Sequence, residues 1–284
     1  MLIKLYNYFL SIFRAKKPFK KIPKIVSTNN SHSYPFLREF EGKTVLITGA
    51  GKGLGAKIAL AFGKAGANVV VNYLKSGNEA KKLVEDLKQS GSDSIALKAD
   101  VSKRFQIETM ISKVINKYGN IDILINNAAV LLKPSDWKTM SSEGWQETLN
   151  VNIFGVAECI RATAKHMSPK NKCKIVNMST FGGGAYIAAY LASKAAVNEL
   201  TKIFAQELSP RINVNAVALS EIKMSTDTYY NKYASNKYIL ETPLKRFGNI
   251  NDVINAVLFL SSSRADFITG HVLVVDGGRR VRIL

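Results

Sequence analysis

The 284-residue sequence has only two cysteines and three histidines, and it has no long apolar run. Cys159 and Cys173 stand far apart among apolar or basic residues, which is typical of reduced thiols outside the secretory route. The histidines are scattered without a second ligand at metal spacing, so we predict no metal site. No window approaches the roughly 18 consecutive apolar residues of a membrane-spanning helix. These shortages exclude a disulfide scaffold, a zinc domain and a chain of spanning helices.

Acidic residues are also scarce, and the formal net charge is +19. Residues 1–38 contain eight Lys or Arg and no Asp or Glu, and the rest of the chain still has 32 basic against 21 acidic side chains. A basic body favours an acidic partner, such as a carrier protein, anionic lipid or RNA, or it is only a well-solvated surface. Because zinc-finger spacing and aromatic-basic RNA motifs are missing, we do not expect a nucleic-acid partner.

Residues 1–39 form an N-terminal extension that differs from the remaining chain. Its polar residues Lys4, Asn7, Ser11 and Arg14 fall on one stripe of a helix, apolar residues cover the rest, and prolines follow. Such a basic, amphipathic N-terminus is typical of a mitochondrial or plastid targeting segment. It also suits a retained arm that docks on a membrane surface or a partner protein. We therefore expect a mitochondrial or other organellar location, with the cytoplasm as the alternative.

Beyond the extension, short β-branched runs alternate with helical stretches. This alternation predicts an α/β fold, a doubly wound parallel sheet of Rossmann type with about seven strands. No break in composition divides residues 40–284, so we predict a single domain there. Strands are expected at 44–48, 66–73, 94–101, 121–129, 173–180, 212–219 and 271–278, and helices up to Ala65 and at 77–89, 104–118, 143–167, 188–208 and 252–260.

The stretch TGAGKGLG (48–55) lies after the first predicted strand and before the first predicted helix. Its glycines at 49, 53 and 55 let the backbone approach a pyrophosphate, and the helix N-terminus supplies N–H donors. This context favours a dinucleotide site over a plain glycine-rich turn. A Walker-type phosphate loop does not fit, because Gly53 and not Ser or Thr follows Lys52.

The end of the second predicted strand bears on the choice of cofactor. An acid at that point usually holds the ribose hydroxyls of NAD, but this strand ends in Asn72, Tyr73, Leu74 and Lys75. Lys52 and Lys75 are suited to bind a 2′-phosphate. The sequence therefore favours NADP(H) over NAD(H).

Several short motifs follow one another in a fixed order. They are TGAGKGLG (48–55), DVS (100–102), NNAA (126–129), NVNIFG (150–155), YLASK (190–194), PLKRFGNINDVINAVLFL (243–260) and ITGHVLVVDGG (268–278). Over roughly 40–278 the chain resembles the short-chain dehydrogenase/reductase family in its compact single-domain form, and it is similar to 3-oxoacyl-carrier-protein reductases. The resemblance implies a seven-stranded sheet, nicotinamide-dependent carbonyl or alcohol chemistry, a small or acyl-carrier-linked substrate, and a homo-oligomer.

The resemblance assigns the reaction to Tyr190, Lys194, Asn152 and Thr180. Tyr190 is the expected general acid, and the ammonium of Lys194 one helical turn later is expected to lower its ordinary pKa of about 10. A Tyr-x-x-x-Lys pair also occurs on plain solvated helix faces. Asn152 matches the family's structural and proton-relay asparagine, or it is a capping or core amide. Thr180 stands at the substrate-binding serine, with Ser179 as the alternative.

The cofactor site implied by the resemblance lies at the ends of the predicted strands. Asp100 is the expected adenine contact, and Lys194 is expected to bind the nicotinamide ribose. The predicted cofactor-binding residues are Gly49, Gly51, Lys52, Gly53, Leu54, Gly55, Tyr73, Asp100, Val101, Asn127, Ala128, Tyr190, Lys194 and Ile222.

The chain departs from the family pattern at its substrate end. Besides the threonine for serine, the loop before the catalytic tyrosine is shorter by about three residues. Ala129 adds a methyl near the nicotinamide, Leu219 and Ser220 replace a usual Pro-Gly, and Met224 stands where a threonine is typical.

These departures allow two interpretations. One is ordinary drift within an active reductase family. The other is a catalytically weak or inactive reductase-like subunit of a larger mitochondrial or membrane complex that still binds nucleotide, since small misplacements of reacting groups slow a reaction strongly. The loops around 131–142 and 220–242 give no substrate preference. Their tyrosines at 229, 230, 233 and 238 either form an aromatic lid or simply pack.

Overall fold

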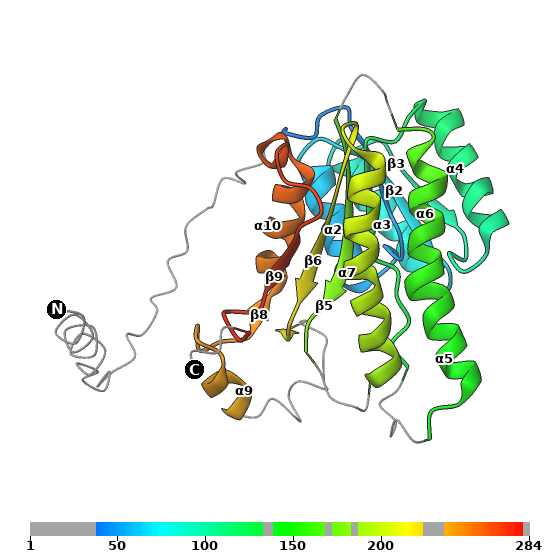
Figure 1. Cartoon of the computed structure of the whole chain (residues 1–284). Helices are drawn as coiled ribbons and strands as arrows, with labels where there is room; N and C mark the ends of the chain where they lie inside the picture. Colours follow the sequence, from blue (N-terminus) through cyan, green and yellow to red (C-terminus); the bar gives the residue numbers. More distant parts are fainter. Residues whose placement is uncertain (1–37, 133–138, 168–171, 183–186, 224–235, 281–284) are drawn as a thin grey trace. The chain divides into compact units, whose positions relative to one another are not determined.

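The computed structural model describes residues 38–132, 139–167, 172–182, 187–223 and 236–280 (Figure 1). Seven parallel strands form one sheet in the order β3-β2-β1-β4-β5-β6-β9, so the predicted doubly wound sheet is confirmed. The strands are β1 (Thr44–Ile47), β2 (Asn68–Tyr73), β3 (Ser94–Lys98), β4 (Ile123–Asn126), β5 (Cys173–Thr180), β6 (Ile212–Leu219) and β9 (Val272–Val275). A second, two-stranded parallel sheet pairs β7 (Ile222–Lys223) with β8 (Gly248–Asn249).

Helices cover both faces of the large sheet. On one face α2, α3 and α10 contribute to a hydrophobic cluster, and on the other face α4, α6 and α7 contribute to a second. The described helices are α2 (Gly53–Lys64), α3 (Gly77–Gln89), α4 (Arg104–Tyr118), α5 (Ser142–Leu149), α6 (Gly155–Ala164), α7 (Ala188–Leu208), α9 (Asn236–Glu241) and α10 (Ile250–Ser261), with a π-helix η1 (Asn150–Phe154) and a 3₁₀ turn η3 (Ser263–Ala265).

Residues 45–47 of β1 form a continuous apolar run because both faces of this strand are buried. Val45 and Ile47 belong to the first cluster, and Leu46 between them belongs to the second. β5 and β6 also hold buried polar residues, and hydrogen bonds satisfy the side chains of Lys174, Asn177 and Asn215.

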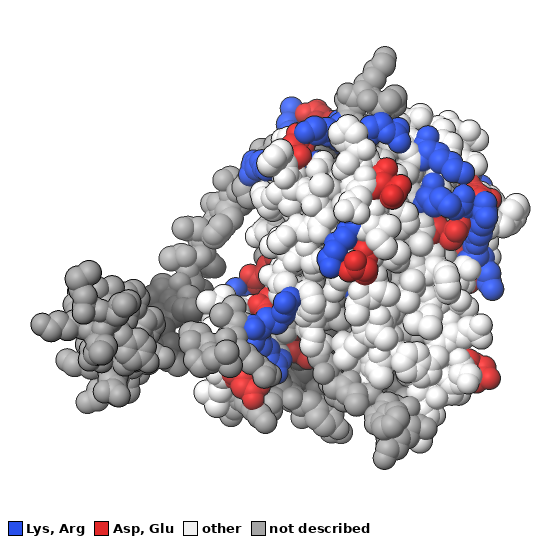
Figure 2. Space-filling view, in the orientation of Figure 1, with Lys and Arg blue, Asp and Glu red and all other residues white. Residues whose placement is uncertain are grey.

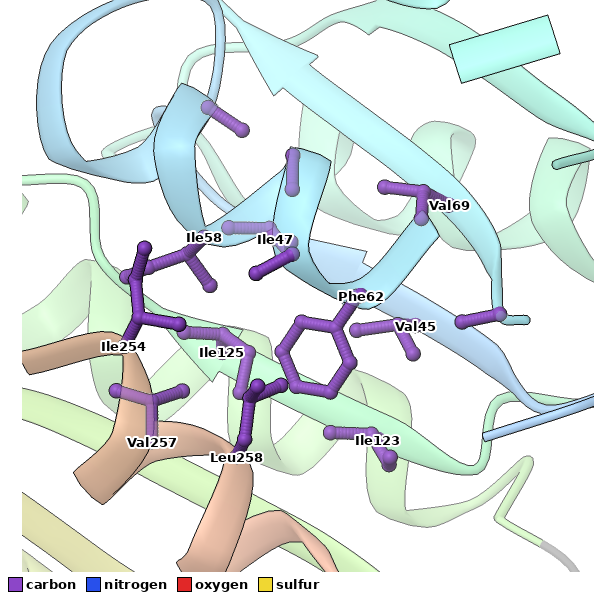
Figure 3. Close-up of a cluster of buried hydrophobic side chains, with 14 of the residues drawn as sticks. Val45, Ile47, Ile58, Phe62, Val69, Ile123, Ile125, Ile254, Val257 and Leu258 are labelled. Carbon is purple, nitrogen blue, oxygen red and sulfur yellow. The ribbon is translucent and has the colours of Figure 1, made fainter. Parts of the chain in front are cut away.

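The first cluster is centred on α2 and α10 (Figure 3). Phe62 of α2 is fully buried and lies among Val45, Ile125 and Leu258, which come from two strands and α10. Its ring also meets Phe40 edge-on at a centroid separation of 4.9 Å. A phenylalanine surrounded in this way fixes α2, and with it the glycine turn that leads into α2.

The structure contradicts the middle of one predicted helix. The sequence predicts a single helix over 143–167, but α5 and α6 are separated by the π-helix Asn150–Phe154. A π-turn widens the helix by about one residue and is common at functional sites. Periodicity at 3.6 residues per turn cannot show such a widening. Its consequence is that Asn152 is fully buried at this point.

Charged side chains are distributed unevenly on the face shown in Figure 2. A wide area over α6 and α7 shows few Lys, Arg, Asp or Glu, and Lys and Arg gather toward the end where β5 and β6 begin. No helix within the described ranges is long and apolar enough to cross a membrane. The predicted N-terminal extension falls almost entirely outside those ranges.

Replacing Phe62 by alanine is expected to lower the free energy of unfolding by about 3–5 kcal/mol, because it leaves a cavity beneath α2. Urea denaturation followed by circular dichroism measures the loss. Phe105→Ala is the matched control: Phe105 is 78% exposed, and its removal should cost less than about 0.5 kcal/mol. Equal losses in the two variants would contradict the packing described here.

Candidate active site

The predicted site residues converge at the carboxyl ends of the central strands. The chain runs from β1 outward to β2 and β3, then returns to β4 on the other side of β1. This reversal of strand order is a topological switch point, and it opens a crevice between the loops that follow β1 and β4. Ligands of open α/β sheets bind in a crevice of this kind. The turn 48–55 follows β1 and faces this crevice.

Each glycine of the turn has its own steric reason. Gly49 and Gly53 both have φ of +62°, a left-handed conformation that other residues rarely adopt. A Cβ on Gly49 would lie 2.8 Å from the Ala128 Cα, and one on Gly55 would lie 2.5 Å from the Asn127 Nδ2. A Cβ on Gly53 would meet no protein atom within 4 Å. Gly53 therefore faces open space where a ligand can approach the backbone.

Three polar side chains hold the turn in place. The Asn127 and Ala128 backbone amides both donate to Thr48 Oγ1 at 3.0 Å, and Asn127 Nδ2 donates to the Thr48 carbonyl oxygen at 2.9 Å. Asn72 is buried; its Oδ1 accepts from the Gly49 amide at 3.1 Å and its Nδ2 donates to the Ala99 carbonyl at 3.0 Å. Thr48 and Asn72 were not among the predicted site residues, although Thr48 opens the glycine motif itself.

The residues present fit the diphosphate of a dinucleotide. The N-terminus of α2 has no capping side chain and no acidic residue in its first turn. The exposed Lys52 occupies the N-cap position, and Leu54 lies half-buried in the first turn. The positive end of the helix dipole and its unpaired N–H groups stabilise an anion at such a position. Gly51 is buried against Ser76, where a Cβ would overlap Ser76 Oγ.

The predicted adenosine contacts lie at the ends of β2 and β3. Tyr73, the last residue of β2, is half-buried, and Lys75 beyond it is exposed. Asp100 Oδ1 accepts a hydrogen bond from the Ser102 amide at 2.9 Å, which shapes the turn after β3. Val101 is buried, and a Cβ on Gly155 would lie 2.9 Å from its carbonyl oxygen. The end of β2 therefore presents no carboxylate to repel a ribose phosphate.

Tyr190 and Lys194 lie on the same face of α7, within its first two turns. Lys194 is only 2% exposed; its Nζ donates to the Met178 carbonyl of β5 at 2.8 Å and lies 5.6 Å from the centroid of the Tyr190 ring. Burial lowers the pKa of Lys194 to about 8. Burial raises the pKa of Tyr190 in the structure, and the opposing effect of Lys194 that the sequence predicts stays a prediction.

Asn152 joins three segments of the site. Its Oδ1 accepts from the Val130 amide at 2.7 Å, and its Nδ2 donates to the Val130 carbonyl and to Ser193 Oγ, both at 3.0 Å. Ser193 Oγ in turn donates to the Tyr190 carbonyl at 2.6 Å. The side chain therefore ties the loop after β4 to the first turn of α7. The proton-relay role remains a prediction.

The two candidate hydroxyls at the end of β5 point in different directions. Ser179 Oγ is buried and donates to the Lys194 carbonyl at 3.2 Å, which fastens α7 to β5. Thr180 Oγ1 donates to the Leu219 carbonyl of β6 at 2.6 Å. Both hydroxyl protons are thus committed to the backbone. Thr180 can still accept a hydrogen bond, because a hydroxyl oxygen has two lone pairs.

The chain after β6 is fixed by one tyrosine. Tyr238 Oη lies 2.9 Å from Ser220 Oγ and accepts from the Glu221 amide at 3.0 Å, and its ring stacks on Phe247 at 4.8 Å. These contacts show Tyr238 packed against its neighbours, and the predicted role as an aromatic lid stays a prediction. Ile222, predicted to contact the cofactor, is buried in β7. Met224 and the tyrosines at 229, 230 and 233 lie outside the described residues.

A Rossmann-type sheet with an open glycine turn at its switch point, together with a Tyr–Lys pair on α7, fits a dinucleotide-dependent oxidoreductase. A family model described as "Enoyl-(Acyl carrier protein) reductase" matches residues 49–280. The chain belongs to the short-chain dehydrogenase/reductase family, whose members act on carbonyl and alcohol groups.

Individual relatives differ in substrate. The chain is 36% identical over 240 residues to a 3-oxoacyl-(acyl-carrier-protein) reductase FabG of Staphylococcus epidermidis, covering 83% of this chain and 98% of the relative. It is 37% identical over 250 residues to the 3beta-hydroxysteroid dehydrogenase 1 of Eggerthella lenta, covering 84% and 94%. The crystal structure of a gluconate 5-dehydrogenase from Burkholderia cenocepacia, in complex with NADP and tartrate, superposes with a TM-score of 0.80 at 29% identity, covering 87% and 99%. Identity alone therefore does not select a substrate.

Gly53→Ala is expected to weaken binding of NADPH or NADH by about ten-fold or more, because the new methyl enters the space open to the diphosphate. Fluorescence titration of the nucleotide measures the effect. Gly42→Ala is the matched control, since Gly42 has φ of +71° and also meets nothing within 4 Å. Each change should cost about 1–2 kcal/mol of stability from backbone strain. Equal nucleotide binding by both variants would contradict the assignment of the turn.

The lowered pKa of Lys194 predicts the pH dependence of carbonyl reduction. Below about pH 8 the side chain is an ammonium that stabilises the negative charge left on Tyr190, and above it the charge is lost. The rate should therefore be level near pH 7 and fall as the pH rises through about 8, well below the ordinary lysine value of about 10.4. Single-turnover rates at saturating nucleotide from pH 6 to 10 test this. The residual rate of Lys194→Arg should lack the decline, and a level wild-type rate to pH 10 would overturn it.

Proposed function

We propose that the protein is an NADP(H)-dependent reductase that interconverts a carbonyl and an alcohol, with 3-oxoacyl thioesters as the leading substrate class. The observation that carries the proposal is the Tyr190–Lys194 pair, which Met178, Asn152 and Ser193 fix through buried hydrogen bonds. The 3-oxoacyl reductase relative supports the substrate class, and the basic body of the chain suits an acidic carrier protein.

The end of β2 supports NADP(H) over NAD(H). β2 ends on Tyr73 and not on an acid that would hold ribose hydroxyls, and the side chain of the preceding Asn72 is occupied by the glycine turn. Lys52 and Lys75 are exposed and offer positive charge to a 2′-phosphate. The related gluconate dehydrogenase structure holds NADP.

The side chains of this protein would act as follows. When bound, the reduced nicotinamide supplies the hydride that the carbonyl carbon receives. Because burial raises the pKa of Tyr190, its phenol keeps its proton at neutral pH and can give it to the carbonyl oxygen. Tyr190 becomes a phenolate in this step, and the ammonium of Lys194 stabilises that charge. Asn152 and Ser193 hold the turn of α7 that carries Tyr190.

The purified protein should oxidise NADPH in the presence of acetoacetyl thioesters, and faster than it oxidises NADH. Tyr190→Phe should lower kcat by about 100-fold or more with nucleotide binding unchanged, because only the proton donor is removed. Tyr118→Phe is the control: Tyr118 donates to the Asp93 carbonyl at 3.2 Å on the far side of α4, and its loss should leave kcat unchanged. A wild-type rate no higher than that of Tyr190→Phe would refute the proposal.

One observation favours a second candidate, a catalytically weak reductase-like subunit of a larger complex that retains nucleotide binding. Thr180 donates its hydroxyl proton to the Leu219 carbonyl at 2.6 Å, so it cannot donate to a substrate carbonyl while this bond lasts. The assay above separates the two candidates. Nucleotide binding without turnover on any ketone or thioester would support the second.

We also propose a homo-oligomer and an organellar location. Phe154 is 61% exposed on η1 and Ile203 is 46% exposed on α7, and exposed large apolar side chains are compatible with association. The basic composition of residues 1–39 supports targeting to a mitochondrion or another organelle. Sedimentation of the purified chain and the location of a C-terminal fluorescent fusion test the two statements.

A further inference from the structure

The chain after β9 forms a turn that Asp276 closes. Both of its carboxylate oxygens accept backbone hydrogen bonds at 2.8 Å: Oδ1 from the Gly278 amide and Oδ2 from the Arg280 amide. Gly277 and Gly278 have φ of +64° and +84°, as a tight turn of this kind requires. The backbone of Arg280 is therefore held at the carboxyl end of β9.

The side chain of Arg280 reaches the substrate end of the site. Its guanidinium carbon lies 3.8 Å from the centroid of the Phe181 ring. Phe181 directly follows Thr180, and its amide donates at 3.2 Å to the same Leu219 carbonyl that accepts the Thr180 hydroxyl. A cation is thus placed one residue away from the predicted substrate-binding position.

Arg280 differs from its neighbours in lacking a carboxylate partner. Both basic and acidic side chains gather beside β8 and α9 in Figure 2, and most of the arginines there are paired. Arg279 is 3.2 Å from Glu241, and Arg246 is 2.6 Å from Asp252. Within the described ranges, no carboxylate lies within ion-pair distance of the Arg280 guanidinium. Its charge remains available to a ligand.

The geometry of the Arg280 side chain suits an anion. A guanidinium that lies over an aromatic ring is oriented by that ring and keeps its N–H groups for a carboxylate or phosphate. The same turn, at Gly277 and Gly278, also lines a hollow of about 600 Å³. Three carboxylates, those of Glu221, Asp252 and Asp276, line it against the single cation Arg246, which is paired with Asp252, and this balance disfavours an anion there. Arg280 is not part of that hollow's lining, so the anion belongs on the Phe181 side.

We propose that Arg280, oriented by Phe181 and by the Asp276 turn, binds an anionic group of the substrate and so determines specificity. This inference rests on the proposed reductase function. The anion is a carboxylate or a phosphate, and two substrate classes supply one: short 3-oxo acids carry a carboxylate near the carbonyl, and 4′-phosphopantetheine thioesters carry a phosphate at the far end of the arm.

Two matched pairs of substrates separate these sources. Acetoacetate and ethyl acetoacetate differ by the carboxylate charge, and acetoacetyl-4′-phosphopantetheine and acetoacetyl-pantetheine differ by the phosphate. Arg280→Gln is expected to raise KM for the charged member of one pair by about ten-fold, with its neutral member changed by less than about two-fold. Arg280→Lys should recover part of the loss. The pair that responds identifies the anion.

Arg279→Gln is the control. Because Arg279 is paired with Glu241, its substitution should leave KM unchanged for both pairs of substrates. Equal effects of Arg280→Gln on charged and neutral members, no effect on either, or the same effect from Arg279→Gln would overturn the inference. Thermal unfolding of each variant separates a folding defect from a binding defect. If Arg280→Gln does not fold, Arg280→Lys is tested in its place.

A binding measurement distinguishes this inference from the reductase proposal. If wild-type protein reduces none of the four compounds, the proposed function fails. Calorimetry with 3-hydroxybutyrate and with 4′-phosphopantetheine then tests whether Arg280 binds an anion. A wild-type affinity that falls about ten-fold in Arg280→Gln supports the inference. Absence of wild-type binding, or equal affinity in the variant, overturns it.

Discussion

The arrangement of the site depends on the buried amide of Asn152. This one side chain makes hydrogen bonds to both backbone groups of Val130 and to Ser193, and Ser193 reaches the Tyr190 carbonyl. A buried amide left unpaired is costly, so the segments around it are restricted to positions that satisfy it. The π-helix places Asn152 at this junction. The position of Tyr190 relative to the β4 loop follows from that constraint more than from the geometry of α7.

Burial acts in opposite directions on the two members of the proton-transfer pair. It raises the pKa of Tyr190 and lowers that of Lys194 to about 8, because a low-polarity surrounding disfavours both phenolate and ammonium. In the ligand-free protein, Lys194 is therefore the group that titrates first. The hydrogen bond from Lys194 to the Met178 carbonyl limits the cost of burying the ammonium, and it holds Nζ near the Tyr190 ring.

The sequence predicts the fold and the position of the glycine turn because both are encoded locally. Seven apolar runs and one strand–turn–helix motif are enough to place the crevice and Gly53. The π-helix could not be predicted, since the residues 150–154 have ordinary helical periodicity. The raised pKa of Tyr190 was also missed, because burial depends on how distant segments pack. Thr48 and Asn72 act through contacts that span at least 23 positions of sequence, which no local pattern reveals.

The substrate end is built from such distant contacts almost entirely. Thr180 ends β5 and Phe181 follows it, Leu219 ends β6 and Arg280 follows β9, and these three segments meet because β5, β6 and β9 lie side by side. The local motifs are shared across the family, and they indicate which cofactor chemistry to expect. The Thr180–Leu219 bond and the Arg280–Phe181 contact depend on residues outside those motifs. In the proposed function, specificity therefore depends on the place where three strand ends meet, and the reaction depends on Tyr190 and Lys194 of α7.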